Sequence, residues 1–147
     1  MVGQGYVGLP VAMRAVEVGF QVVGFEASIE RVTALATGHS HVGDVPDEQL
    51  SAALRKGYVP STDRADLADF DIAVISVPTP LTDGLPDLSF ITAAGRDLAS
   101  HLRPGACVIL ESTTYPGTTS ELLAPVLEEE SGHYGRKEKP AAIHGRT

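Results

Sequence analysis

Residues 3–10 constrain the fold of this chain more than any other segment. They follow the pattern G-x-G-x-x-G, with Gly3, Gly5 and Gly8, and lead directly into an apolar run with helical spacing. In a strand–turn–helix unit, the first glycine allows the tight turn and the second lets main chain approach a diphosphate. The third lets the helix pack closely on the sheet. The segment therefore predicts a dinucleotide-binding turn at a helix N-terminus, where free N–H groups attract phosphate.

The residues on either side of this turn support a strand–turn–helix–strand order. Residues 1–2 are expected to end a strand, residues 9–18 to form the helix, and residues 21–25 to form the next strand. Because a buried parallel strand usually has about five or six residues, we expect the chain to begin inside its first strand. A shortened central strand leaves neighbouring main-chain groups unpaired, so we expect the chain to be marginally stable and its melting temperature to rise when strand residues are added.

Glu26 directly follows the predicted second strand, at roughly the 20-residue offset at which a carboxylate accepts from the adenosine ribose hydroxyls. A carboxylate there repels a 2′-phosphate, which favours NAD over NADP. The alternative is a solvated Glu at a strand end. Arg31 either contacts the ribose or lies on a solvated helix face.

The rest of the chain alternates strands and helices. Residues 72–77 and 107–110 are continuous apolar strands, and residues 58–61 are expected to form an edge strand. This order predicts an α/β, Rossmann-like doubly wound parallel sheet with a truncated first strand, spanning residues 1–130. Residues 131–147 are polar, charged and rich in glycine, which predicts a disordered tail.

Local patterns also predict helix starts. Ser28, Asp47 and Asp87 each precede an expected helix and are residue types that cap N-termini. Thr118 and Glu121 have capping-box spacing. Residues 81–86 are expected to form a loop.

Composition limits the function classes. The net charge of −8 argues against a nucleic-acid partner. No apolar run approaches the ~20 residues that a membrane span needs, and no signal peptide precedes Gly3, so a cytoplasmic location is expected. Cys107 is the only cysteine, which excludes an intrachain disulfide and fits a reducing compartment. His39 and His41 lie two positions apart, but no carboxylate or cysteine cluster accompanies them, so loop histidines are favoured and no metal is expected.

Three motifs, in this order and spacing, resemble the UDP-glucose/GDP-mannose dehydrogenase family. They are GQGYVGLP at residues 3–10, VPTPL at residues 77–81 and ESTTYPGTT at residues 111–119. The third is most similar to the branch that acts on UDP-N-acetyl-hexosamines. The resemblance covers residues 1–130 and corresponds to the N-terminal cofactor domain.

The resemblance implies NAD as cofactor and a part in polysaccharide biosynthesis. Members of this family oxidise the C6 alcohol of a nucleotide sugar to a carboxylate, using two NAD⁺ and passing through a thiohemiacetal and a thioester on a cysteine. The residues that would contact the cofactor are Gly3, Gly5, Tyr6, Val7, Gly8, Glu26, Arg31, Pro78, Thr79, Pro80, Ser112 and Thr113. Thr113 would also be catalytic, because the family's threonine sits near the nicotinamide and the reacting sugar carbon. The alternative for Thr113 is a turn or capping hydroxyl.

The family's nucleophilic cysteine, lysine and asparagine lie beyond the part that this chain matches, and Cys107 is not the nucleophile, because it enters a predicted buried strand. A UDP-sugar substrate and a homo-oligomer are therefore expected only together with the missing C-terminal domains. No membrane partner is expected. Three alternatives remain open: a stand-alone NAD-binding module or inactive fragment, a Rossmann dehydrogenase acting on a hydroxy acid, and a flavin protein.

Overall fold

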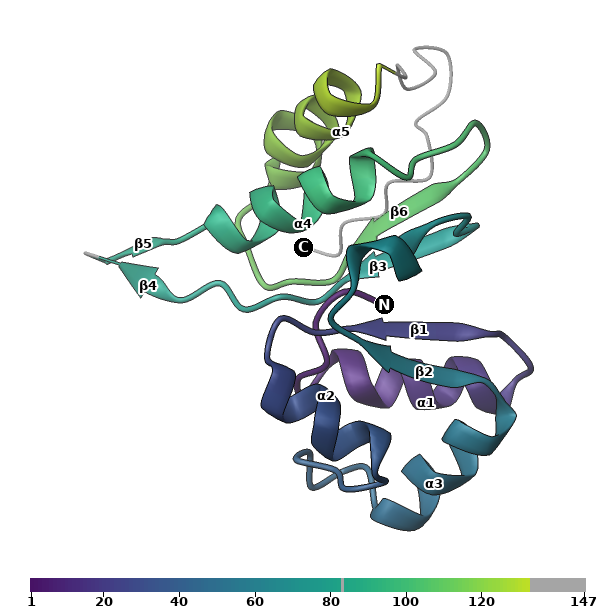
Figure 1. Cartoon of the computed structure of the whole chain (residues 1–147). Coiled ribbons are helices and arrows are strands. Elements are labelled where there is room, and N and C mark those ends of the chain that lie inside the picture. Colours follow the sequence, from purple (N-terminus) through teal and green to yellow (C-terminus); the bar gives the residue numbers. More distant parts are fainter. Residues whose placement is uncertain (83, 133–147) are drawn as a thin grey trace. The chain divides into compact units, whose positions relative to one another are not determined.

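The computed structural model describes residues 1–82 and 84–132, which fall into two compact units (Figure 1). Unit 1 comprises residues 1–66, and unit 2 begins at residue 67. Most of the predicted tail, residues 133–147, lies outside the described residues. Each unit has its own pair of parallel strands.

Unit 1 pairs two strands and covers them with helices. Its elements are α1 (Gly8–Glu17), β1 (Val22–Phe25), α2 (Ile29–Ala36), α3 (Asp47–Lys56) and β2 (Tyr58–Ser61). Strands β1 and β2 run parallel, with Val22 opposite Tyr58. In Figure 1 the three helices lie on one side of this strand pair. A 3-10 turn, Arg64–Leu67, follows β2.

The first two residues pair with β1, as the glycine turn requires. Val2 forms a parallel bridge with Phe25. The N–H of Phe25 donates to the carbonyl of Met1 over 2.8 Å, and the N–H of Gly3 donates to the carbonyl of Phe25 over 2.9 Å. This confirms the predicted order in which a strand segment leads into the turn.

The core of unit 1 forms where the apolar stripes of the helices meet β2. Leu9, Met13 and Val16 bury one face of α1, at the spacing expected for an amphipathic helix. Leu35 of α2 and Leu50 of α3 join them in the same cluster. This packing holds the start of α1, and hence the glycine turn before it, on the strand pair.

Unit 2 repeats the arrangement with a second parallel pair. Its elements are β3 (Ile72–Ile75), β4 (Leu81–Thr82), β5 (Leu85–Pro86), α4 (Ser89–Ala99), β6 (Cys107–Leu110) and α5 (Ala124–Ser131). Strands β3 and β6 run parallel, with Ile72 opposite Cys107. Helices α4 and α5 lie side by side (Figure 1), and a Cβ added at Gly95 of α4 would come within 3.2 Å of Val126 of α5. Gly95 therefore permits this close helix packing.

Several local predictions need correction. Asp47 is not a cap: Pro46 holds the N-cap position of α3, and the carboxylate of Asp47 instead accepts from the N–H of Ser40 over 2.8 Å. The capping box at Thr118 is absent, because its hydroxyl donates backwards to the carbonyl of Tyr115 and the next turn, Thr119–Leu123, is π-helical. In the segment expected to be a loop, β4 (Leu81–Thr82) and β5 (Leu85–Pro86) pair antiparallel.

Ser28 and Asp87, unlike Asp47, each accept a hydrogen bond from the first turn of the helix that follows them. The hydroxyl of Ser28 accepts from the N–H of Arg31 over 3.3 Å, which confirms it as the cap of α2. Leu88, rather than Asp87, holds the N-cap position of α4. The carboxylate of Asp87 nevertheless accepts from the N–H of Ser89 over 2.9 Å, so it satisfies one donor of the first turn. Hydrogen bonds from the side chain of Ser89 and from its N–H lower the pKa of Asp87.

Candidate functional site

The glycine turn of unit 1 presents open main chain in front of a helix. Gly3 has a φ of 90°, a left-handed conformation that favours glycine. A Cβ placed on Gly5 would meet nothing within 4 Å. The N-cap residue of α1, Val7, makes no side-chain capping bond. In the first turn the N–H of Leu9 donates to the carbonyl of Gly5 over 3.0 Å, and Pro10 has no N–H. The positive end of the helix dipole suits this end to attract an anion.

Glu26 lies directly beside this turn. Its Oε2 accepts from the N–H of Gln4 over 3.1 Å, and its Oε1 accepts from the N–H of Ser28 over 3.2 Å. The side chain is 11% exposed, and Nη1 of Arg31 lies 3.7 Å from Oε2. A carboxylate has about four lone-pair sites, so both oxygens can accept further hydrogen bonds from hydroxyl groups. The structure thus brings together the turn, the carboxylate and the guanidinium that the sequence predicted as one group.

Two predicted residues of the turn, Tyr6 and Val7, are exposed at 76% and 48%. Exposed large apolar side chains in the glycine turn are available to contact a ligand. Their roles stay predictions.

A polar network behind the turn was not expected from the sequence. Gln4, which lies between the first two glycines, is fully buried, and its Oε1 accepts from the Tyr58 hydroxyl over 2.7 Å. Nothing in the local pattern links two residues that are 54 positions apart. One signal was present: Gly24 interrupts an apolar strand, and such a glycine often marks a close approach.

The predicted residues of unit 2 meet where its two parallel strands end. The hydroxyl of Thr79 donates to the carbonyl of Thr113, and the two threonine Oγ1 atoms lie 3.3 Å apart. The hydroxyl of Ser112 donates to the carbonyl of Val77 over 2.7 Å. The carboxyl edge of parallel strands is where ligands bind in such sheets. These bonds tie the second and third sequence motifs together.

The side chains in this second group differ in availability. Ser112 is 8% exposed, and its hydroxyl is bonded to main chain. This bond holds the segment after β6 against the segment after β3. Thr113 is exposed, so its hydroxyl can reach a ligand. Pro78 and Pro80 are also exposed on either side of Thr79. Cys107 is half-buried at the first position of β6.

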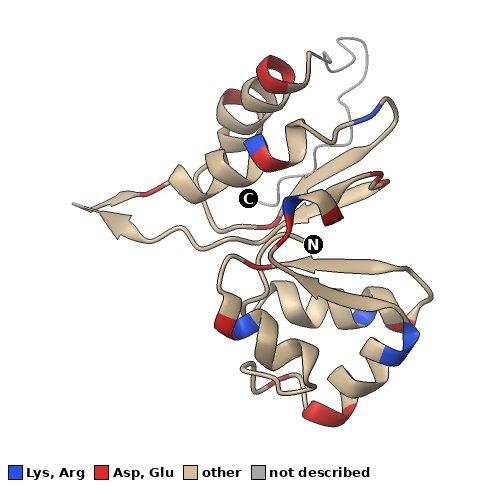
Figure 2. Cartoon of the chain, viewed as in Figure 1, with Lys and Arg blue, Asp and Glu red and all other residues tan. Residues whose placement is uncertain are grey.

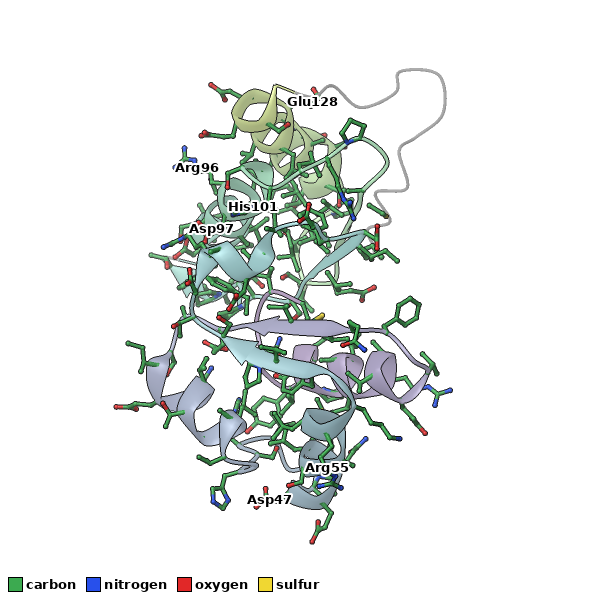
Figure 3. All side chains as sticks on the ribbon, turned by 45° about the vertical axis from the view of Figure 1, so that its right-hand side comes forward. Asp47, Arg55, Arg96, Asp97, His101 and Glu128 are labelled. Carbon is green, nitrogen blue, oxygen red and sulfur yellow. The ribbon has the colours of Figure 1, made fainter. Side chains whose placement is uncertain are left out.

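Acidic side chains outnumber basic ones in both units, most strongly among the described residues of unit 2, whose basic residues are Arg96 and Arg103. Acidic and basic residues are spread over the helices and loops of each (Figure 2). His39 contacts Asp47 over 3.2 Å, at the exposed start of α3 (Figure 3), while Nε2 of His41 donates to the carbonyl of Gln4 over 2.8 Å. The Ser40 N–H and His39 lower the pKa of Asp47. Among residues 1–82 and 84–132, no group of three or more His, Cys, Asp or Glu side chains is placed to hold a metal.

In the same described residues, none of the helices has the length and apolar character needed to cross a bilayer.

Comparison with known proteins decides the family. The model described as "UDP-glucose/GDP-mannose dehydrogenase family, NAD binding domain" matches residues 1–140. The chain belongs to the UDP-glucose/GDP-mannose dehydrogenase family. It corresponds to the NAD-binding domain, and NAD is the cofactor of that domain.

Curated members of this family align with most of the chain. A UDP-N-acetyl-D-mannosamine dehydrogenase of Pyrococcus horikoshii is 38% identical over 134 residues, which is 90% of this chain and 32% of the relative. A UDP-N-acetyl-D-glucosamine 6-dehydrogenase of Pseudomonas aeruginosa is 37% identical over 135 residues, 90% of this chain and 31% of the relative. The chain thus spans about a third of the length of these relatives.

A solved member of the family confirms the Rossmann-like fold class. The structure of the UDP-D-ManNAc dehydrogenase of Pyrococcus horikoshii matches with a TM-score of 0.86 and 32% identity, covering 97% of this chain and 37% of that one.

Proposed function

We propose that this chain is the NAD-binding part of a nucleotide-sugar 6-dehydrogenase that oxidises the C6 alcohol of a UDP-N-acetyl-hexosamine to the uronic acid. The observation that carries the cofactor site is the position of Glu26, whose two oxygens accept from Gln4 and Ser28 beside the glycine turn. The substrate class rests on the names of the relatives in Pyrococcus horikoshii and Pseudomonas aeruginosa, which act on UDP-N-acetyl-hexosamines.

The residues of unit 1 fit a bound dinucleotide. The open space above Gly5 and the uncapped start of α1 accept the diphosphate, and Glu26 accepts the adenosine ribose hydroxyls. Arg31, close to Glu26, orients that carboxylate. A negative charge at this position disfavours a 2′-phosphate, so the site selects NAD over NADP.

The residues of unit 2 fit the end of the cofactor at which hydride transfer takes place. Bound NAD would supply the acceptor for the hydride that leaves C6 of the sugar. Oxidation of an alcohol to a carboxylate removes four electrons, which corresponds to two such transfers. Thr113 presents an uncharged hydroxyl that positions water or the sugar oxygen, and Thr79 fixes the main chain of Thr113. Pro78 and Pro80 border the cofactor.

Titration calorimetry with NAD tests this proposal. We expect the full chain to bind NAD more tightly than NADP. Glu26→Ala should weaken NAD binding about ten- to a hundredfold, because hydrogen bonds to a charged group contribute about 1.5–3 kcal/mol. The matched control is Glu48→Ala, which removes an exposed carboxylate in the first turn of α3 and should bind NAD like the wild type.

Folded chain that shows no heat of binding at millimolar NAD would contradict the cofactor assignment. Equal losses for Glu26→Ala and Glu48→Ala would contradict the role of Glu26.

A further inference from the structure

Every polar atom of Gln4, the residue between the first two glycines of the turn, takes part in a hydrogen bond. Gln4 is fully buried. Its side-chain Nε2 donates to the carbonyls of Met1 and Gly3 over 3.1 and 3.0 Å, and its Oε1 accepts from Tyr58. Its main-chain N–H donates to Glu26, and its carbonyl accepts from His41. The peptide groups on either side of Gln4 therefore cannot rotate without breaking several hydrogen bonds.

Tyr58 supplies the most distant of these bonds. It is the first residue of β2 and is 2% exposed. Burial and the charge of Glu26 raise the pKa of its phenol, so the hydroxyl stays protonated and acts as a donor. Its bond to Gln4 joins the glycine turn to the outer strand of the β1–β2 pair.

The strand between the two partners leaves room for the contact. A Cβ added at Gly24 of β1 would lie 2.4 Å from the Tyr58 hydroxyl oxygen and 2.7 Å from Oε1 of Gln4. Real Cβ atoms do not approach other atoms so closely. Three separate segments of unit 1 are thus fitted to one buried hydrogen bond.

We propose that the Gln4–Tyr58 pair is a positioning device that holds the glycine turn in the conformation that receives the cofactor's diphosphate. Gln4 also carries the N–H that fixes Glu26, so the same buried side chain sets the ribose-binding carboxylate relative to the diphosphate-binding amides. This inference rests on the proposed NAD binding and adds two residues to it that do not touch the cofactor. The competing explanation is a core hydrogen bond that stabilises the fold and nothing else.

Two variants separate these explanations. Tyr58→Phe removes one hydroxyl and leaves Oε1 of Gln4 without its donor. The double variant Gln4→Met, Tyr58→Phe leaves neither partner of the Gln4–Tyr58 bond unpaired. It also removes the two bonds that Nε2 of Gln4 donates to the carbonyls of Met1 and Gly3. The control is Thr33→Val, which removes a hydroxyl that donates within α2 to the carbonyl of Ile29.

The readout is the affinity for NAD and for adenosine, measured by NMR titration of the full chain, with urea unfolding to establish that each variant is folded. Adenosine carries the ribose that Glu26 binds but lacks the diphosphate. We expect Tyr58→Phe to bind NAD about three- to tenfold more weakly, the change in affinity that corresponds to one net hydrogen bond, and the double variant, which loses more bonds, to bind at least as weakly. Adenosine affinity should stay within about twofold of the wild type, as should both affinities of Thr33→Val.

Two results overturn the inference while leaving the proposed function in place. One is unchanged NAD affinity in the double variant, and the other is an equal loss of NAD and adenosine affinity. A wild-type chain that binds no NAD would overturn the proposed function and this inference together. If Tyr58→Phe does not fold, the double variant decides the question.

Discussion

At the scale of single residues, Glu26 is the side chain whose position was predicted from the sequence and whose environment was not. Its offset from the glycine turn indicated a ribose contact because the strand–turn–helix–strand unit has a nearly constant length. The two main-chain N–H groups that orient it, from Gln4 and Ser28, depend on how the chain closes around the carboxylate. The sequence predicted a carboxylate beside the turn, and the fold supplied its orientation.

The amino group of Met1 leads to a pH prediction at this scale. It donates to the carbonyl of Val23 over 2.8 Å, and burial lowers its pKa from 8.0 to about 6. Between these values the unfolded chain binds more protons than the folded chain, so stability rises with pH from 6 to 8. We expect the free energy of unfolding to increase by about 2 kcal/mol over this range, measured by urea unfolding.

An extension of a few residues before Met1 is the control for this prediction, because it replaces the ammonium by a neutral amide. The five histidines are common to both chains, so the difference between their pH profiles isolates the amino group. Identical profiles would show that Met1 does not carry the effect.

At the scale of secondary-structure elements, strands were predicted more accurately than helix starts. The expected strand over residues 107–110 coincides with β6 (Cys107–Leu110), because a short apolar run in a parallel sheet has few alternatives. Caps were less predictable, since a polar side chain near a helix start has several main-chain groups within reach. Asp47 accepts from Ser40 in the preceding loop, and Thr118 donates to Tyr115, so neither caps its helix.

The end of α3 gives a prediction for an element. Gly57 has a φ of 113°, and a Cβ there would lie 2.2 Å from Oε1 of Gln21. Gly57→Ala should therefore lower the free energy of unfolding by about 1–2 kcal/mol, the cost of a left-handed non-glycine residue. Urea unfolding followed by circular dichroism measures this.

The matched control is Gly43→Ala, where a Cβ meets nothing within 4 Å. It should change stability by about 0.5 kcal/mol or less. Equal losses in the two variants would contradict the assignment of strain to Gly57.

At the scale of the whole molecule, two units each bring one group of site residues together. Unit 1 assembles the turn, Glu26 and Arg31, and unit 2 assembles Thr79 and Thr113. The thiohemiacetal and thioester that the proposed reaction passes through need a cysteine nucleophile. The chain has one cysteine, Cys107, at the start of β6. Thr79 and Thr113 meet at the other end of these strands, where the chain leaves β3 and β6. Cys107 therefore lies at the opposite end of β6 from Thr113.

The prediction at this scale concerns turnover. We expect the 147-residue chain to form no NADH from NAD and UDP-N-acetylglucosamine, measured by absorbance at the NADH band, although it binds NAD. NADH formation that is lost in Thr113→Val would instead mean that the chain carries out oxidation by itself. NADH formation that is lost in Cys107→Ala would make Cys107 the nucleophile.

The sequence by itself determined the glycine turn, the carboxylate after the second strand, the parallel α/β class and the family, because each depends on short-range spacing or on motifs whose order is visible in one dimension. Only the tertiary structure decided which distant side chains meet. The Tyr58 hydroxyl reaches Gln4 because the parallel register and the missing Cβ of Gly24 leave space for it. Thr79 reaches Thr113 because β3 and β6 end together. Strand register and packing are long-range properties, and local residue patterns do not encode them.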